Sequence, residues 1–221
     1  MNRKFTLAFI TVMILHTADA QVTFGIRTGL NYANWQGAGI NSLNNIVAYT
    51  KGFVTTTSRK AFHIGGYADI PLGNGMSFEP GLQYSQKGYV LKGDLAITAL
   101  KFIGVNASAK VESNYIDIPL LLKADLSKGL SIYAGPQVSF LVHSDFHLNA
   151  GILGISLYNK KIDITSDFNK TDLGLSGGIG YQFSNGINMK AGYDYGLTRL
   201  DKNDSYKAYN RVVKISLGYS F

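Results

Sequence analysis

The chain has 221 residues, of which 46% are hydrophobic and only 16% are charged, and it contains 25 glycines and no cysteine. This much apolar surface excludes an intrinsically disordered chain. The absence of cysteine excludes disulfides, zinc–thiolate sites and thiol nucleophiles. The formal net charge of +7 comes without clustered runs of Lys and Arg, so we expect no nucleic-acid partner and instead a surface near anionic lipid or polysaccharide.

Residues 1–20, MNRKFTLAFITVMILHTADA, have the pattern of an export signal. Arg3 and Lys4 precede an apolar stretch from Phe5 to Leu15, and Ala18-Asp19-Ala20 supplies the small residues of a cleavage site. The apolar stretch is too short to span a membrane as a helix. We therefore predict a cleaved signal peptide over residues 1–20, followed by one domain over residues 21–221.

The rest of the chain alternates hydrophobic residues with polar residues and glycines, which is the period-two pattern of amphipathic β-strands. The pattern predicts eight strands, near residues 22–35, 61–70, 76–89, 115–123, 130–140, 173–183, 187–195 and 213–221. Many of them exceed the usual strand length of a soluble sheet. They reach the length of about 9–11 residues that a tilted strand needs to cross a membrane.

The connections between these strands alternate between short and long. Three are tight turns, at residues 71–75, 125–129 and 184–186, and four are longer polar segments, at residues 36–60, 88–112, 144–170 and 198–210. Short turns at one rim and long loops at the other are typical of an outer-membrane barrel. We therefore predict an all-β fold, an eight-stranded antiparallel up-and-down transmembrane β-barrel.

In this barrel the apolar faces would meet lipid and the glycine-rich polar faces would line a narrow lumen. Aromatic residues near the strand ends suggest interfacial girdles: Tyr32, Trp35, Tyr84, Tyr89, Tyr193 and Tyr195. The alternative is a soluble barrel whose apolar faces turn inward around a ligand.

The order of several segments resembles the PorT-type outer membrane protein beta-barrel domain family of Bacteroidetes. The segments are VTFGIRTGLNYANW at 22–35, YIDIPLLLK at 115–123, IYAGPQVSFLV at 132–142, DLGLSGGIGYQF at 172–183 and AGYDYGLTRL at 191–200. The resemblance implies an eight-stranded integral barrel related in architecture to OmpA and OmpX. The C-terminal VVKISLGYSF, with Tyr219 and Phe221, also resembles the signal by which bacterial outer-membrane barrels are recognised for insertion.

Two motifs raise the question of catalysis. Residues 174–178 match G-x-S-x-G, but that motif needs a sharp strand-to-helix turn, and here a strand continues past Ser176. His143 and His147 flank Asp145 in a predicted loop; in extended backbone the two imidazoles would lie about 13 Å apart, too far to share a metal. We expect solvated loop histidines there and a hydrogen-bonded lumen residue at His63.

Charged residues on the lumen-facing positions are more informative. They are Arg27, Asp69, Glu79, Asp117, Lys190, Asp194 and Lys214. The expected hairpin registers place Arg27 opposite Asp69, Asp69 opposite Glu79, and Asp194 opposite Lys214. Because a buried charge needs a partner and eight strands leave room only for side chains, we predict an ion-pair network that plugs the lumen.

The expected role is therefore structural or interactive, exercised through loops outside the outer membrane, with both termini in the periplasm. No catalytic residue, cofactor or metal is expected, and the chain is expected to be a monomer. Expected partners are outer-membrane lipid and lipopolysaccharide, the barrel-assembly machinery during insertion, and surface or secretion-system proteins. Three alternatives remain: a small solute pore or transporter, an accessory component of a protein-secretion system, and an enzyme at the rim.

Overall fold

The computed structural model describes residues 21–49, 54–95, 105–152, 155–202 and 207–221. The predicted signal peptide lies outside the described residues. The elements in chain order are β1 (Thr23–Gln36), α2 (Ala38–Tyr49), β2 (Val54–Gly73), β3 (Met76–Leu95), β4 (Val105–Asp125), β5 (Leu130–Ile152), β6 (Ile155–Asp163), the short helix η2 (Thr165–Asp167), β7 (Thr171–Gln182), β8 (Ile187–Gly196) and β9 (Tyr209–Ser220).

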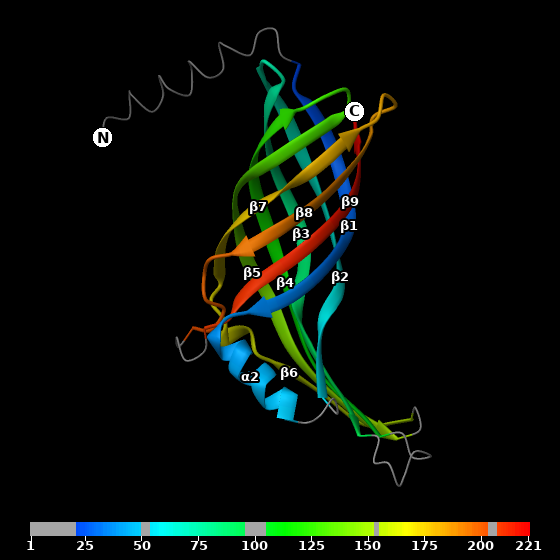
Figure 1. The fold of residues 1–221 in the computed structure, drawn as a ribbon, viewed down its shortest axis with the longest axis vertical. Coiled ribbons are helices and arrows are strands. Elements are labelled where there is room, and N and C mark those ends of the chain that lie inside the picture. The colour runs from blue at the N-terminus through cyan, green and yellow to red at the C-terminus, as the bar shows by residue number, and fades with distance from the viewer. Residues whose placement is uncertain (1–20, 50–53, 96–104, 153–154, 203–206) are drawn as a thin grey trace, which may run out of the picture.

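Eight of these strands close into an antiparallel ring. Neighbours follow the order β4-β3-β2-β1-β9-β8-β7-β5, and pairing of β4 with β5 completes the circle. The ninth strand, β6, pairs with the distal half of β5 and stands outside the ring. The predicted eight-stranded up-and-down barrel is confirmed, and Figure 1 shows its strands inclined to the long axis of the molecule.

The two ends of the barrel differ. One end, which we call the turn rim, carries the tight turns after β2, β4 and β7, together with the first residue of β1 and the last of β9 (Figure 1). In the β2–β3 turn, Gly73, Asn74 and Gly75 all have positive φ, a conformation that glycine and asparagine adopt most readily. The other end, the loop rim, carries the longer connections.

The barrel is apolar outside and polar inside. Ile26, Leu82 and Leu217 are more than half exposed on the outer surface, whereas Ser85 and Asp117 are fully buried in the lumen. A soluble protein has the reverse arrangement, so the soluble alternative is wrong and the predicted faces are correct. Among the described residues, no helix is long and apolar enough to cross a membrane.

Two predicted loops are largely strand. The segments 88–112 and 144–170 contain the distal parts of β3, β4 and β5 and the whole of β6, which continue well beyond the ring (Figure 1). We call this continuation the upper sheet, although it lies at the bottom of Figure 1: residues 54–60 of β2, 86–95 of β3, 105–114 of β4, 143–152 of β5, and β6. The predicted loop 36–60 likewise contains α2 and the start of β2.

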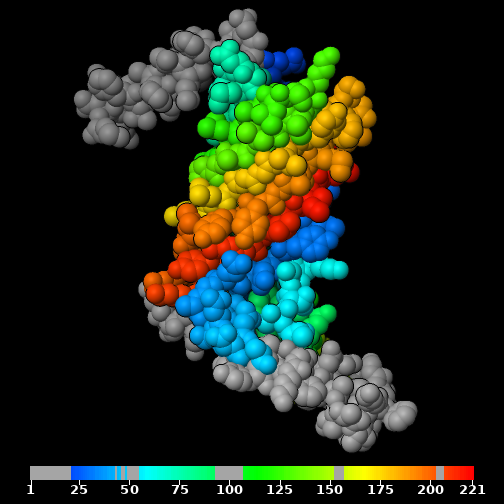
Figure 2. Space-filling view, viewed as in Figure 1, coloured from blue at the N-terminus to red at the C-terminus, as the bar shows by residue number. Residues whose placement is uncertain are grey.

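Helix α2 lies at the loop rim, beside the end of β1 and the start of β2 (Figure 2). Its Ile40 is buried with Tyr89, Leu200 and Ala208, and Trp35, Leu91 and Phe168 pack around this cluster. The Trp35 and Tyr89 rings stack with centroids 5.6 Å apart. The prediction that Trp35 and Tyr89 belong to an interfacial girdle is therefore wrong, because both side chains pack in the cluster that α2 forms at the loop rim.

Candidate functional site

The lumen near the turn rim holds one carboxylate between two cations. Arg27 Nη1 lies 2.8 Å from Glu79 Oε1, and Lys190 Nζ donates to both Glu79 oxygens at 2.7 Å. The Tyr67 ring lies 4.0 Å from the Arg27 guanidinium, and the Tyr133 ring lies 4.4 Å from the Lys190 ammonium. Three strands, β1, β3 and β8, thus meet at Glu79, which is 3% exposed.

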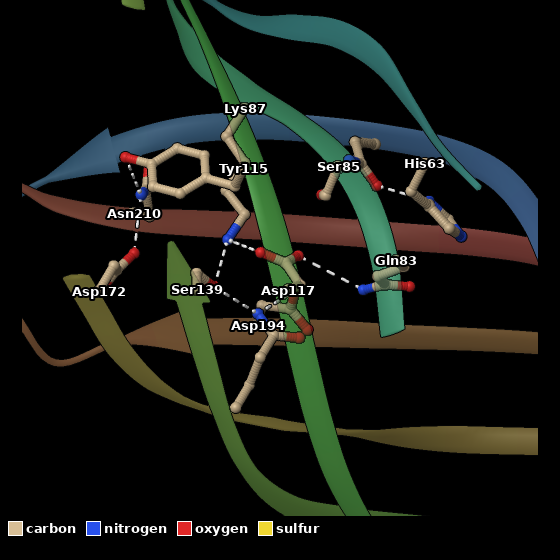
Figure 3. Close-up of polar contacts among 12 residues, drawn as sticks. His63, Gln83, Ser85, Lys87, Tyr115, Asp117, Ser139, Asp172, Asp194 and Asn210 are labelled. Carbon is tan, nitrogen blue, oxygen red and sulfur yellow. Dashed lines mark hydrogen bonds and ion pairs between the residues drawn. The ribbon is translucent and has the colours of Figure 1, made fainter. Parts of the chain in front are cut away.

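A second cluster lies in the lumen nearer the loop rim (Figure 3). Lys87 Nζ lies 2.9 Å from Asp117 Oδ1 and donates to Ser139 Oγ at 2.9 Å. Lys214 Nζ lies 2.6 Å from Asp194 Oδ2 and 3.4 Å from Asp117 Oδ2. All four charged side chains are buried, and their two positive charges balance the two negative charges. The cluster links β3, β4, β8 and β9 across the lumen.

Two of the three predicted registers need correction, whereas the pairing of Tyr67 with Gly81 and of Ile70 with Phe78 places Asp69 opposite Glu79, as predicted. Arg27 lies opposite Gly65, and Asp69 lies opposite Thr23; Asp69 forms its ion pair with Lys123 near the turn rim instead of with Arg27. The predicted register took residues 36–60 as the loop, which centres it near residue 48, whereas β2 begins at Val54 and its pairs with β1 centre the connection on residue 46. Asp194 lies opposite Val212 rather than Lys214, and the long lysine side chain bridges the diagonal.

Of the seven predicted lumen residues, the structure therefore brings together Arg27, Glu79 and Lys190 in one cluster and Asp117, Asp194 and Lys214 in the other. Lys87 and Lys123 were missed as partners. Both continue the lumen-facing alternation of their strands, so the period-two pattern contained the signal. A further buried contact, from Asn210 Nδ2 to Asp172 Oδ2 at 2.8 Å, lies beside the second cluster (Figure 3).

The void among the side chains of the second cluster is small. The void lined by Lys87, Gln137, Asp172 and Asp194 measures about 10 Å³, which is about the room that one water molecule needs. Glycines supply the space for the larger side chains, because a Cβ at Gly192 would overlap the Tyr133 hydroxyl.

Ser176 and His63 both lie inside the barrel. Ser176 is a buried lumen residue within β7, and that strand continues to Gln182. His63 contacts Asn31 Oδ1 at 2.8 Å through Nδ1 and Ser216 Oγ at 2.9 Å through Nε2, as predicted. No group of three or more His, Asp or Glu side chains in the described segments is arranged to hold a metal ion.

His143 and His147 lie on β5 rather than in a loop, which corrects the prediction. His143 Nε2 lies 2.9 Å from Asp145 Oδ1, and His147 Nε2 lies 3.7 Å from Glu112 Oε2. Burial acts to raise the pKa of Glu112, but hydrogen bonding to Lys110 and the charge of Arg59 outweigh it and hold that pKa below its usual value. The outer face of the upper sheet is thus a charged, hydrogen-bonded surface.

The inner face of the upper sheet, which continues the lumen side of each strand, is mostly apolar. Across neighbouring strands the register aligns one row of Tyr89, Val111, Phe146 and Ile162 and a second row of Leu91, Ala109, Leu148 and Lys160. Tyr89 and Leu91 are covered by the α2 cluster. Farther from α2, exposure rises to 40% at Ile162 and 48% at Tyr158.

A closed barrel with an apolar exterior, a charged interior and a folded sheet above one rim defines an integral outer-membrane β-barrel protein. The family model described as outer membrane protein beta-barrel domain matches residues 4–202. The chain belongs to this family.

Solved structures with similar folds share little sequence with the chain. Ail, the attachment invasion locus protein of Yersinia pestis, is 13% identical, with a TM-score of 0.46 over 91% of this chain and 99% of Ail. Neisserial surface protein A is 14% identical, with a TM-score of 0.41 over 91% of this chain and 99% of that protein. No curated protein matches the chain.

Proposed function

We propose that this protein is a closed, non-catalytic barrel that displays the upper sheet outside the cell for contact with other surface molecules. One observation carries the proposal: β3, β4 and β5 are each 20 residues or longer, about twice what a tilted strand needs to cross the membrane. The residues beyond the apolar belt are ordered into a sheet with a mostly apolar inner face. The two ion-pair clusters and α2 would close the lumen beneath it.

The orientation belongs to the same proposal. Residues 1–20 would direct export, the turn rim and both termini would face the periplasm, and the loop rim would face outward. Tyr219 and Phe221 are exposed on the outer surface, where the barrel-assembly machinery would recognise them. We place the chain in the PorT-type branch of its family, as a monomer surrounded by lipid and lipopolysaccharide. A role as an accessory component of secretion is the competing proposal.

Site-specific photo-cross-linking in intact cells tests this function. A photoreactive amino acid at Tyr158, on the upper sheet, is expected to give adducts with surface macromolecules. The same amino acid at Leu126, which is 58% exposed in a turn-rim loop, serves as the matched control and is expected to give none of these adducts. If protein adducts form only from position 126, a role as a secretion accessory is favoured. The absence of adducts from position 158 would contradict the surface role.

A further inference from the structure

We propose that the outer edge of β6 binds an extended segment of a partner protein as an added strand, and that the segment carries an acidic residue between two apolar ones. This inference rests on the proposed function, because it requires the upper sheet to face outward. It specifies the chemistry of the partner.

The edge of β6 presents backbone groups for pairing. Among the described strands, β6 pairs with β5 alone, over residues 145–152 of β5. Ile164 N donates to Ser144 O at 2.9 Å, and antiparallel residues alternate between pairing and non-pairing positions. Ile162 and Lys160 therefore direct their backbone groups toward β5. Asn159 and Lys161 direct theirs toward the open edge, where a further strand can pair with them.

The inner-face rows define which side chains would fit beside β6. One row ends at Ile162, the next ends at Lys160, and the following position is Tyr158 opposite Ala150. All three β6 side chains are exposed. Directly opposed side chains stabilise a strand pair when both are apolar or when their charges are opposite. An added strand would therefore place an apolar residue beside Ile162, an acidic residue beside Lys160 and an apolar residue beside Tyr158.

The two neighbouring lysines of β6 differ in whether their charge is matched. Lys161 Nζ lies 2.9 Å from Asp145 Oδ2, so its charge is already matched within the sheet. Lys160 lies at the end of its inner-face row, so an added strand would place a side chain directly beside its positive charge. The selectivity of the edge should therefore depend on Lys160.

Binding of short peptides to the full-length protein in detergent or lipid nanodiscs tests the inference. The probe is the capped, fluorescein-labelled peptide TVTETVT, and the matched control is TVTKTVT. We expect the glutamate peptide to bind about tenfold more tightly than the lysine peptide. Lys160→Glu should reverse this preference, because it inverts the charge at the end of the row.

Backbone pairing is tested separately. Asn159→Pro removes an N–H from the open edge while keeping the ladder to β5, and it should weaken binding of TVTETVT by about tenfold or more. Asn159→Ala keeps the N–H and should bind like the unaltered protein. Heat-modified mobility on gels verifies folding of each variant. Equal binding of both peptides, or equal binding by Asn159→Pro and Asn159→Ala, would overturn the inference; surface adducts at Tyr158 would still support the proposed function.

Discussion

Replacing Asp117 by Asn is expected to lower the free energy of unfolding by about 3–5 kcal/mol, because removing one partner of a buried ion pair leaves the other charge uncompensated. Lys87 is 1% exposed and has Asp117 as its ion-pair partner at 2.9 Å. Lys214 retains its ion pair with Asp194, so most of the expected destabilisation comes from the unpaired charge of Lys87. Denaturant unfolding in detergent, followed by the fluorescence of the single tryptophan, Trp35, measures the change.

Two variants control this experiment. Asp69→Asn breaks the pair with Lys123, whose side chains are 19% and 17% exposed, and should cost about 1 kcal/mol or less. The double variant Lys87→Met with Asp117→Asn removes both charges and should recover much of the loss, since it leaves no uncompensated Lys87 charge in the lumen. An Asp117→Asn protein as stable as the parent would contradict the role of the network.

Replacing Gly192 by Val is expected to destabilise the barrel by about 3 kcal/mol or more, because the lumen has no room for the added atoms. The Cβ would overlap the hydroxyl of Tyr133. That ring cannot move freely, since it packs against the Lys190 ammonium, which is itself bonded to Glu79. The same unfolding measurement gives the result.

Gly66→Val is the matched control, because it makes the same change on the same kind of strand. Gly66 faces outward, and the nearest atom to an added Cβ, Gly25 O, is 3.6 Å away. We expect a stability within about 0.5 kcal/mol of the parent, or a small gain from the better strand propensity of valine. Equal losses at Gly192 and Gly66 would show that packing of the lumen does not decide the effect.

The strands within the apolar belt were predictable, whereas their continuation above it was not. In β3 the apolar residues point outward through Tyr84 and then inward at Tyr89 and Leu91; in β5 they change sides after Val142, where the register shifts. The reason is that lipid surrounds the belt and water surrounds the upper sheet. The predicted strands follow one apolar face, so each of them ends where the apolar residues move to the other face of the strand.

Helix α2 was also missed, although Ile40, Leu43 and Val47 have helical spacing. The segment is short and polar around these residues, and its helix packs against Tyr89 and Leu200 from distant parts of the chain. The lumen position of the charged residues was predictable, because each of them lies on the polar face of its strand. Their pairing was not, because Arg27 meets Glu79 across the lumen rather than along a hairpin.

Single-channel recording in planar bilayers tests the central claim, a closed barrel, most directly. The purified protein is expected to give no steady conductance, because in the proposed function the ion pairs of Arg27 with Glu79 and of Lys87 with Asp117 close the lumen beneath α2. Steady openings of nanosiemens size from the same preparation would contradict the account and favour a solute pore.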